Sequence, residues 1–544
     1  MTAATKSFSK WQSYAQTLDP VHVSWLKHAK TSRTKFAVAD IVGAEIPHDR
    51  FLTAVLLFSK KIKVISPEQN IGLLLPSSAG GAITTMAILA LGKTIVNLNF
   101  TAGKKALQSA VEQAKIKHIY SSSKFFDKMY EKGVDLASFF PGVKVLFLED
   151  IKEEISGLSK IGCLLSAKLM PVGMIRKLFF KEVAPNDTAA ILFSSGSEGE
   201  PKGVELTHNN IAANAKQAAI AMEAVSTDVV MSTLPTFHAF GFAVTTLMPL
   251  TEGVPIVCHP DPTDVATIAS GVEKYHGTIL VGTPTFLRLY SINKKVSSKS
   301  LQTLRLIFAG AEKLRAEVRN AFEKKFNKEI CEGYGTTETS PAVSINLPPD
   351  ASGPRTKVGT VGRALDGTEF KIVDPDSLDE LATGKDGLIL ISGPQLMKGY
   401  LNMPEKTAEA IEIIDGYRWY RSGDKGHLDE DGYLTIVDRY SRFAKIAGEM
   451  ISLTTVEEQI LEALKNADVE VAATCLPDQR KGERIVLLAT EGVTKEVLQK
   501  ALNDAKVNPL YHPAKVYSVK EIPKLGSGKI DFGATKKIAL AHIE

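Results

Sequence analysis

A loop of serine and glycine residues with a single lysine is the segment of this sequence whose residue types best suit phosphate binding. It follows an apolar run and reads Ser194-Ser-Gly-Ser-Glu-Gly-Glu-Pro-Lys-Gly203. Successive backbone N–H groups and hydroxyls in such a loop can surround phosphate oxygens, and Lys202 adds a cation. It is not a Walker A loop, because Pro201 stands five residues after Gly196, where that motif requires glycine. Taken alone, the composition fits a surface hairpin equally well.

Six further segments carry side chains suited to chemistry on a nucleotide and an acid. They are Leu234-Pro-Thr-Phe-His-Ala-Phe-Gly241, Ala309-Gly-Ala-Glu312, Gly333-Tyr-Gly-Thr-Thr-Glu338, Tyr420-Arg-Ser-Gly-Asp424, Val437-Asp-Arg439 and Gly526-Ser-Gly-Lys529. Each has an ordinary explanation by itself: Glu338 can begin a helix, Tyr334 can be a core aromatic, and Lys529 can be a solvated charge. Their occurrence as one ordered set is what favours a shared function.

The seven segments resemble, in the same order, the motifs of the adenylate-forming superfamily, which includes acyl-CoA synthetases, luciferases and non-ribosomal adenylation domains. Within it, the chain is most similar to the acyl-ACP synthetase half of the bifunctional lysophospholipid acyltransferase/acyl-ACP synthetase. The residues that carry this closer resemblance are 195–199, 309–313, 442–450 and 525–529. The resemblance runs from about residue 70 to 535.

The resemblance implies a set of site residues. ATP binding is implied for Ser194, Ser195, Gly196, Ser197, Gly199, Lys202, Gly310, Ala311, Glu312, Tyr334, Gly335, Asp424 and Arg439. An acyl pocket is implied for Phe237, His238 and Gly241, within the stretches 237–246 and 281–286. Catalytic roles are implied for Thr337, Glu338 and Lys529, with the Glu338 carboxylate as a hard oxygen ligand for Mg²⁺.

The implied reaction is activation of a fatty acid by ATP and transfer of the acyl group to acyl carrier protein. A carboxylate is a poor electrophile, because its negative charge repels nucleophiles; an anhydride with AMP has a good leaving group. Forming it requires preorganised cations and backbone donors that hold two anions together. Lys529 is expected to bridge the carboxylate and α-phosphate oxygens. The candidate cations for docking the acidic carrier protein are Arg480, Lys481, Arg484, Lys515, Lys520 and Lys524.

Three residues depart from the superfamily pattern. Glu198 stands in the phosphate loop where most members have threonine, so its side chain is expected to point away or to help hold Mg²⁺. Asp438 replaces the commoner glycine before Arg439. Ser441 stands where a hinge aspartate or lysine is frequent, which leaves the pivot of the small domain open.

Three other functions remain as alternatives. An acyl-CoA synthetase shares the first half-reaction and differs only in the thiol acceptor. A phospholipid acyltransferase is a distant alternative suggested by the His-x4-Asp spacing of His259 and Asp264, and it would consume no ATP. A non-catalytic nucleotide-binding relative is disfavoured, because the lysines and carboxylates of the motifs are present.

Length and composition fit a multi-domain enzyme. The 544 residues are 44% hydrophobic and 23% charged, which is ordinary globular composition. The 65 basic and 61 acidic residues leave a net charge of +4, too weak to indicate nucleic acid as a partner. Four cysteines lie far apart, which predicts neither disulfides nor a zinc site. The N-terminal 30 residues lack an apolar leader, so we expect a cytoplasmic protein.

The elements that must position these motifs are predicted from apolar runs. Up to about residue 345, runs such as 71–75, 117–120, 145–148, 189–193, 255–257 and 306–309 alternate with helical patterns, which indicates α/β layers with mostly parallel sheets. A Pro/Gly stretch at 347–354 then interrupts the pattern, and strand-and-turn texture follows. We therefore predict a large adenylation domain of α/β subdomains and a small β-rich subdomain over residues 1–438, and a small mobile α+β domain over 439–544.

One segment outside the motifs has an unusual composition. Residues 160–181 interleave bulky apolar side chains with lysine and arginine, and Pro171 limits any helix there to two short pieces. Such a segment is a candidate for peripheral contact with the anionic inner face of a membrane. Packing against the rest of the enzyme would explain the same composition.

Overall fold

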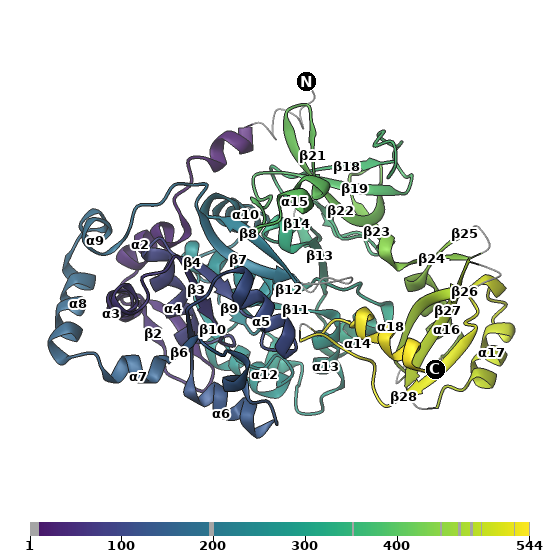
Figure 1. Cartoon of the computed structure of the whole chain (residues 1–544), viewed down its shortest axis with the longest axis horizontal. Helices are drawn as coiled ribbons and strands as arrows, with labels where there is room; N and C mark the ends of the chain where they lie inside the picture. Colours follow the sequence, from purple (N-terminus) through teal and green to yellow (C-terminus); the bar gives the residue numbers. More distant parts are fainter. Residues whose placement is uncertain are drawn as a thin grey trace. The chain divides into compact units, whose positions relative to one another are not determined.

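A computed structural model of the chain describes residues 10–194, 201–350, 353–446, 449–465, 469–478, 482–490, 492–526 and 528–542 (Figure 1). By their internal contacts these residues form two compact units. Unit 1 comprises the described residues of 1–196, 200–370 and 391–420, and unit 2 those of 371–390 and 421–544. The predicted domain boundary at 438/439 rests on the hinge motif and remains a prediction.

Two largely parallel sheets form the core of unit 1. The seven-stranded sheet contains, in spatial order, β20 (Gly399–Tyr400), β8 (Lys202–Thr207), β7 (Thr188–Ser194), β4 (Thr94–Asn97), β3 (Asn70–Leu73), β5 (His118–Ser121) and β6 (Lys144–Phe147). The nine-stranded sheet contains β17 (Arg363–Ala364), β14 (Ala342–Ile345), β13 (Cys331–Gly335), β12 (Leu306–Ala309), β11 (Ile279–Gly282), β9 (Val230–Ser232), β10 (Ile256–Cys258), β1 (Phe36–Asp40) and β2 (Ile46–Pro47). The predicted α/β layering with mostly parallel strands is thereby confirmed.

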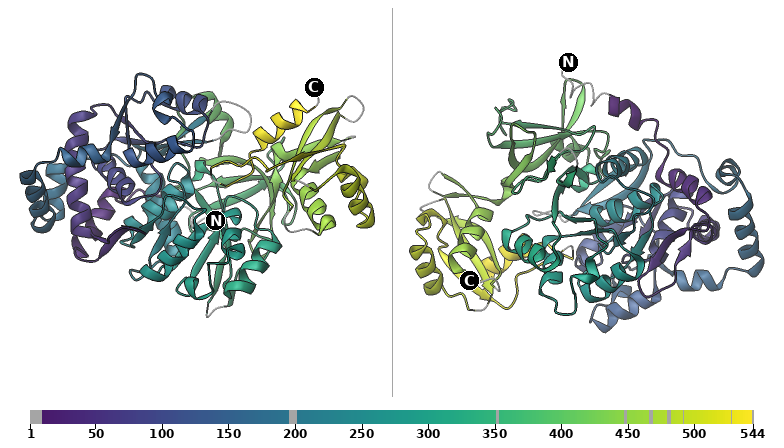
Figure 2. Two further views of the ribbon diagram at one scale, coloured as in Figure 1. Left: turned by 90° about the horizontal axis from the view of Figure 1, so that it is seen from below. Right: turned by 180° about the vertical axis from the view of Figure 1, so that it is seen from behind.

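Helices cover these sheets and lie between them (Figures 1 and 2). Those of the first half are α2 (Val21–Thr31), α3 (His48–Ile65), α4 (Ala79–Ala90), α5 (Lys104–Gln113), α6 (Ser123–Glu131), α7 (Leu148–Glu153), α8 (Gly157–Leu169) and α9 (Val172–Phe179). They are followed by α10 (His208–Ala221), α11 (Met248–Thr251), α12 (Val265–Tyr275), α13 (Pro284–Ile292), α14 (Ala316–Phe326) and α15 (Pro404–Ala410). Helix α4 is apolar on nearly every side because it contacts β4 of one sheet and β1 of the other.

Antiparallel strands follow the parallel part, as predicted. The Pro/Gly stretch at 347–354, expected only to interrupt the pattern, includes parts of two paired strands, β15 (Leu347–Asp350) and β16 (Gly353–Arg355). Pro348 and Pro349 are tolerated because β15 and β16 form a separate two-stranded ribbon. A five-stranded sheet then contains β18 (Glu369–Val373), β19 (Gly387–Ser392), β21 (Ile411–Ile414), β22 (Tyr417–Leu428) and β23 (Leu434–Arg439).

The C-terminal part of unit 2 is the predicted α+β fold. Its sheet contains β24 (Phe443–Ile446), β25 (Glu449–Ser452), β26 (Val471–Asp478), β27 (Gly482–Thr490) and β28 (Lys515–Val519). Helices α16 (Leu453–Leu464), α17 (Lys495–Asp504) and α18 (Phe532–Ala541) accompany it. Val456 and Ile460 of α16 face the core, since both side chains are fully buried.

Candidate active site

Three of the predicted motif segments and the predicted acyl-pocket stretch 281–286 meet at one edge of the nine-stranded sheet. Strands β13, β12, β11 and β9 are neighbours in that order and run parallel, so their carboxyl ends lie along the same edge. The segments that follow these four strands are 334–338, 310–312, 283–286 and 233–241. The carboxyl edge of a parallel sheet is where α/β proteins bind ligands. The topology thus makes one candidate site from residues more than 100 positions apart.

The segment after β12 is held in a tight conformation. Gly310 N–H donates to the Gly282 carbonyl at 3.2 Å, and a Cβ at Gly310 would come within 3.0 Å of the Phe240 ring. Ala311 has φ +73°, a left-handed conformation that is uncommon for alanine and is typical of functional loops. The Glu312 carboxylate accepts from Thr285 Oγ1 at 2.8 Å and from the Thr285 N–H at 3.3 Å. Glu312 therefore stabilises the first turn of α13, a task that its predicted nucleotide role did not include.

The segment after β13 turns sharply back on itself. A Cβ at Gly335 would lie 2.0 Å from the Pro341 carbonyl oxygen, so no residue larger than glycine fits this position. Thr336 Oγ1 and Thr339 Oγ1 cap the short 3-10 turn Thr337–Thr339, and the Met397 N–H donates to the Glu338 carbonyl at 2.8 Å. These contacts fix the backbone that presents Thr337 and Glu338, whose side chains are half-buried.

A tyrosine outside the seven segments joins two of them. Strand β20 pairs with β8, which places Tyr400 opposite Val204, beside the phosphate loop. The Tyr400 hydroxyl donates to Glu338 Oε1 at 2.9 Å, and Lys202 Nζ lies 5.1 Å from the centroid of the Tyr400 ring. Lys202, predicted to bind phosphate, and Glu338, predicted to bind Mg²⁺, therefore both contact Tyr400, and the three residues form one cluster. No sequence signal singled out Tyr400, because a two-residue strand has no periodicity.

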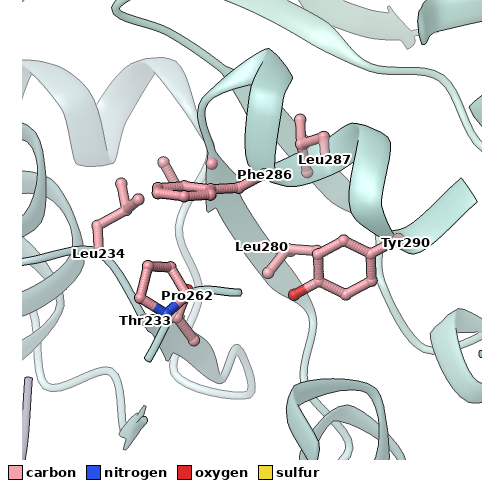
Figure 3. Close-up of a pocket in the computed structure, with 9 residues that line it drawn as sticks. Thr233, Leu234, Pro262, Leu280, Phe286, Leu287 and Tyr290 are labelled. Carbon is pink, nitrogen blue, oxygen red and sulfur yellow. The ribbon is translucent and has the colours of Figure 1, made fainter. Parts of the chain in front are cut away.

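A pocket opens at the same edge of the sheet, near the ends of β9, β10 and β11 (Figure 3). Its space is about 200 Å³, the opening to solvent included. It is lined by Thr233, Leu234, Pro262, Leu280, Val281, Gly282, Phe286, Leu287 and Tyr290. Burial raises the pKa of the Tyr290 hydroxyl, so this group stays protonated. Val281, Gly282 and Phe286 belong to the predicted stretch 281–286, whereas Phe237, His238 and Gly241 do not line this pocket.

Phe237 and His238 belong to a compact turn that leads into a π-helix at Phe240–Leu247, and Gly241 lies in the first turn of that helix. Phe237 is buried and packs edge-to-face on Phe100, with ring centroids 4.9 Å apart. His238 Nδ1 accepts from the Phe240 N–H at 3.3 Å. A Cβ at Gly241 would lie 2.2 Å from the Pro235 carbonyl oxygen, which explains the glycine. Wide π turns occur frequently at functional sites, and the acyl role of this segment remains a prediction.

In unit 2, the two predicted ribose and hinge residues are paired with each other. Asp424 on β22 lies opposite Arg439 on β23, and Arg439 Nε donates to Asp424 Oδ1 at 2.9 Å. The Asp424 side chain is 4% exposed, whereas that of Arg439 is 59% exposed. The pairing leaves the guanidinium largely in solvent, where it can meet an anion.

Asp438, which departs from the family pattern, is the centre of a buried polar network in unit 2. Its Oδ2 accepts from Ser452 Oγ at 2.6 Å and from the Thr454 N–H at 3.1 Å, at the start of α16. Arg442 Nε lies 3.8 Å from Asp438 Oδ1, and Arg442 Nη2 lies 3.0 Å from Glu457 Oε1. A glycine at position 438 could make none of these side-chain contacts. Ser441, the other departure in the hinge, is exposed.

Lys529 lies on a narrow β-turn in unit 2. The Leu525 N–H donates to the Lys529 carbonyl at 2.7 Å, and residues Lys524 and Ile530 form a β-bridge. Gly528 has φ +88°, which a residue with a side chain would strain to adopt. The Lys529 side chain is half-buried. Ser527 of this loop lies outside the described residues, as do Ser195, Gly196, Ser197, Glu198 and Gly199 of the phosphate loop.

The donor set fits a magnesium ion that is shared with a nucleotide. Within the described ranges, no group of three or more His, Cys, Asp or Glu side chains is arranged to hold a metal. Mg²⁺ does not need such a cage, since proteins commonly bind it through one or two carboxylates together with waters and substrate phosphates. Glu338, whose carboxylate is fixed by Tyr400, fits that role.

Comparison with known proteins decides the family. The family model described as "AMP-binding enzyme" matches residues 51–401, which include the phosphate loop, the pocket and Glu338. The chain belongs to the AMP-binding enzyme family. It is 29% identical over 476 residues to 4-coumarate–CoA ligase 2 of Nicotiana tabacum, an alignment that covers 86% of this chain and 84% of that protein.

Solved structures show the same fold over nearly the whole chain. The anthranilate CoA ligase AuaEII in complex with anthranoyl-AMP matches with a TM-score of 0.80 at 20% identity, covering 97% of this chain and 98% of that one. ATP-bound MatB from Rhodopseudomonas palustris matches with a TM-score of 0.77 at 22% identity, covering 95% and 98%. This AMP-binding enzyme therefore has the α/β adenylate-forming fold, and the family places it among adenylate-forming ligases.

Proposed function

We propose that this AMP-binding enzyme activates a fatty acid with ATP as an acyl-adenylate and transfers the acyl group to the phosphopantetheine thiol of acyl carrier protein. The observation that carries the first half of the proposal is the contact of Tyr400 with both Lys202 and Glu338. This contact joins a cation suited to the leaving phosphates to a carboxylate suited to a metal ion. Formation of the acyl-adenylate brings two anions, the carboxylate and ATP, together, and it therefore requires charged groups that are held in fixed positions.

The side chains divide the work by their chemistry. Lys202 supports the β- and γ-phosphates, whose charge grows as they leave. Thr337, on the same turn as Glu338, offers a hydroxyl to the α-phosphate, and Tyr334 offers an aromatic face to adenine. Asp424 accepts from the ribose hydroxyls, and Lys529 is the cation that follows the shift of charge between carboxylate and α-phosphate. A bound Mg²⁺ would neutralise phosphate charge and polarise the phosphoryl oxygens.

The apolar side chains around the small pocket at the ends of β9, β10 and β11 support an apolar acid as substrate. Most of its lining side chains are aliphatic or aromatic, and Thr233 and Tyr290 supply the hydroxyls. Ligand pockets with an apolar lining and a few polar groups select apolar ligands and orient them. The closer resemblance of residues 195–199 and 442–450 favours a fatty acid and carrier protein as the pair of substrates.

An acyl-CoA synthetase is the second candidate, and the comparisons favour it. Several relatives and structural matches carry CoA ligase in their names, among them 4-coumarate–CoA ligases and an anthranilate CoA ligase. The first half-reaction would be the same. The acyltransferase alternative is weaker. The Asp264 carboxylate accepts from the Thr267 N–H as the N-cap of α12, and it lies 3.7 Å from His259 Nε2, which is too far for the hydrogen bond of a catalytic His–Asp pair.

A product assay separates these functions. The purified protein is incubated with ATP, Mg²⁺, a series of fatty acids of increasing chain length or 4-coumarate, and either CoA or phosphopantetheinylated carrier protein. We expect acid-dependent formation of AMP and pyrophosphate, and acylated carrier protein as the main product. Efficient acylation of CoA instead would assign the second candidate. Acyl transfer without ATP would contradict adenylation altogether.

A further inference from the structure

Helices α8 and α9 carry an apolar stripe on their outward side. Leu158, Ile161, Leu165 and Leu169 follow one another at spacings of three, four and four residues, which places them on one side of α8. All four are exposed, Leu158 by 84% and Leu169 by 75%. Met174 and Leu178, four residues apart on α9, are also exposed. We call these six residues the α8–α9 stripe.

The stripe is not a sign of loosely packed helices. The other side of α8 is firmly seated, since Cys163 and Ala167 are completely buried, and α8 packs along α3. Ile175 of α9 is likewise fully buried. Figures 1 and 2 show both helices on the outside of unit 1, beside α3. The helices are thus anchored by one face and present a second apolar face, where a surface helix normally presents polar residues.

The charge along the stripe is mainly positive, although Lys168 Nζ lies 3.6 Å from Asp49 Oδ2 and glutamates flank the segment at 153, 154 and 182. Residues 155–181 contain Lys160, Lys168, Arg176, Lys177 and Lys181 and no aspartate or glutamate, a net charge of +5. Two more cations lie at the end of α8: Lys30 Nζ donates to the Ala167 carbonyl at 2.6 Å, and Arg33 Nη1 to the Lys168 carbonyl at 2.8 Å. Apolar side chains bordered by cations complement a surface that has an anionic layer above an apolar one.

We propose that the α8–α9 stripe rests on an anionic lipid bilayer, with the six apolar side chains at the level of the acyl chains and the surrounding cations at the phosphates. The contact is peripheral: in the part of the chain that the structure describes, no helix is long and apolar enough to span a membrane. The proposal concerns two helices, α8 and α9, that carry none of the adenylation motif residues, so it stands independently of the acid and the acceptor.

Vesicle sedimentation tests the contact with the intact protein and no substrate. The probes are vesicles of phosphatidylcholine alone and of phosphatidylcholine mixed with phosphatidylglycerol. We expect binding to the mixed vesicles that weakens with salt. The variant Leu158→Ser/Ile161→Ser/Leu169→Ser should bind on the order of 100-fold more weakly, because each exposed side chain loses its apolar burial. Lys160→Glu/Lys177→Glu should bind at least tenfold more weakly.

The matched control is Val358→Ser/Ile413→Ser, which removes two apolar side chains that are similarly exposed, 67% and 66%, elsewhere on unit 1. Its binding and its thermal unfolding should equal those of the unchanged protein. Replacing Phe179 or Phe180 would be a poorer test, because Lys60 Nζ lies over the Phe179 ring and Phe180 packs against His22.

Two results would overturn the proposal. One is binding to mixed vesicles that the stripe and charge variants leave unchanged. The other is the absence of vesicle binding; if the stripe variants then also raise KM for carrier protein, the stripe is a protein-docking surface. Vesicle binding together with failure of the product assay would leave the membrane contact intact and refute only the proposed reaction.

Discussion

Replacing Tyr400 with phenylalanine removes one atom from the cluster of Lys202, Tyr400 and Glu338. The lost hydroxyl donates to Glu338 Oε1 at 2.9 Å. The ring remains, and with it the contact to Lys202 Nζ at 5.1 Å. A hydrogen bond to an ionised group is worth about 1.5–3 kcal/mol, which corresponds to roughly 10- to 150-fold in rate if it is used fully in the transition state. We therefore expect Tyr400→Phe to lower kcat/KM for adenylation by a factor in that range.

The assay is acid-dependent exchange of pyrophosphate into ATP, measured over a range of Mg²⁺ concentrations. If Tyr400 positions the Glu338 carboxylate for the metal, Tyr400→Phe should also need more Mg²⁺ for half-maximal activity. Tyr400→Leu removes the ring as well, and loss of the cation–π contact of about 0.5–2 kcal/mol should reduce the rate by a further 2- to 30-fold.

Tyr120→Phe is the matched control. Tyr120 lies on β5 of the same seven-stranded sheet, outside the motifs, and its hydroxyl forms a hydrogen bond of similar length, 2.8 Å, with the Ser66 hydroxyl. Tyr120→Phe should lose about 1 kcal/mol of unfolding free energy, as for a neutral hydrogen bond, and Tyr400→Phe up to about 1.5–3 kcal/mol. Equal losses of adenylation in the two variants, or an unchanged Mg²⁺ requirement in Tyr400→Phe, would refute the positioning role.

Three further predictions concern unit 2, the acceptor and pH. Lys529→Ala should slow adenylation by roughly 10²–10⁴ and affect thiol transfer from supplied acyl-adenylate much less; equal losses in both steps would contradict this. Charge reversal at the exposed Lys515 and Lys520 should raise KM for carrier protein and leave pyrophosphate exchange unchanged, whereas Lys524 is less suitable because it pairs with Glu470 at 2.8 Å. Burial lowers the pKa of His22 to about 3 and of His48 and His208 to about 4, so the unfolded chain binds more protons below pH 6.5. The free energy of unfolding should therefore fall by about 1.4 kcal/mol per pH unit for each histidine between pH 6.5 and 4. In His48→Gln, urea unfolding measured at several pH values should show a free energy of unfolding that falls less steeply with decreasing pH.

The strands of the parallel sheets are predicted well from the sequence, because a parallel strand is buried on both sides and therefore appears as an apolar run. The runs at 71–75 and 306–309 correspond to β3 and β12. The stretch 347–354 was misjudged as an interruption, because proline frequency speaks against a strand and the isolated β15–β16 ribbon tolerates it.

The candidate site was only partly predictable for a different reason. The motif residues can be recognised from their order along the chain, but the residues that form hydrogen bonds with them lie in distant parts of the sequence. Tyr400 reaches Glu338 only because β20 pairs with β8, and Glu312 caps α13 only because β11 and β12 are neighbours. Asp438 has no sequence signal for its bonds to Ser452 and Thr454, which depend on where α16 begins.

The arrangement of β13, β12, β11 and β9 along one sheet edge has a consequence for the evolution of specificity. The segments after β12 and β13 carry the residues proposed for the nucleotide, whereas the pocket is built at the ends of β9, β10 and β11. Each loop is anchored by its own strand, so the loops can vary with little effect on one another as long as the Glu312–Thr285 contact between them is kept. A lineage could exchange Leu234, Pro262 or Phe286 and acquire a new acid while its machinery for ATP stayed intact. The same separation gives protein engineers a short set of positions at which to redirect the enzyme.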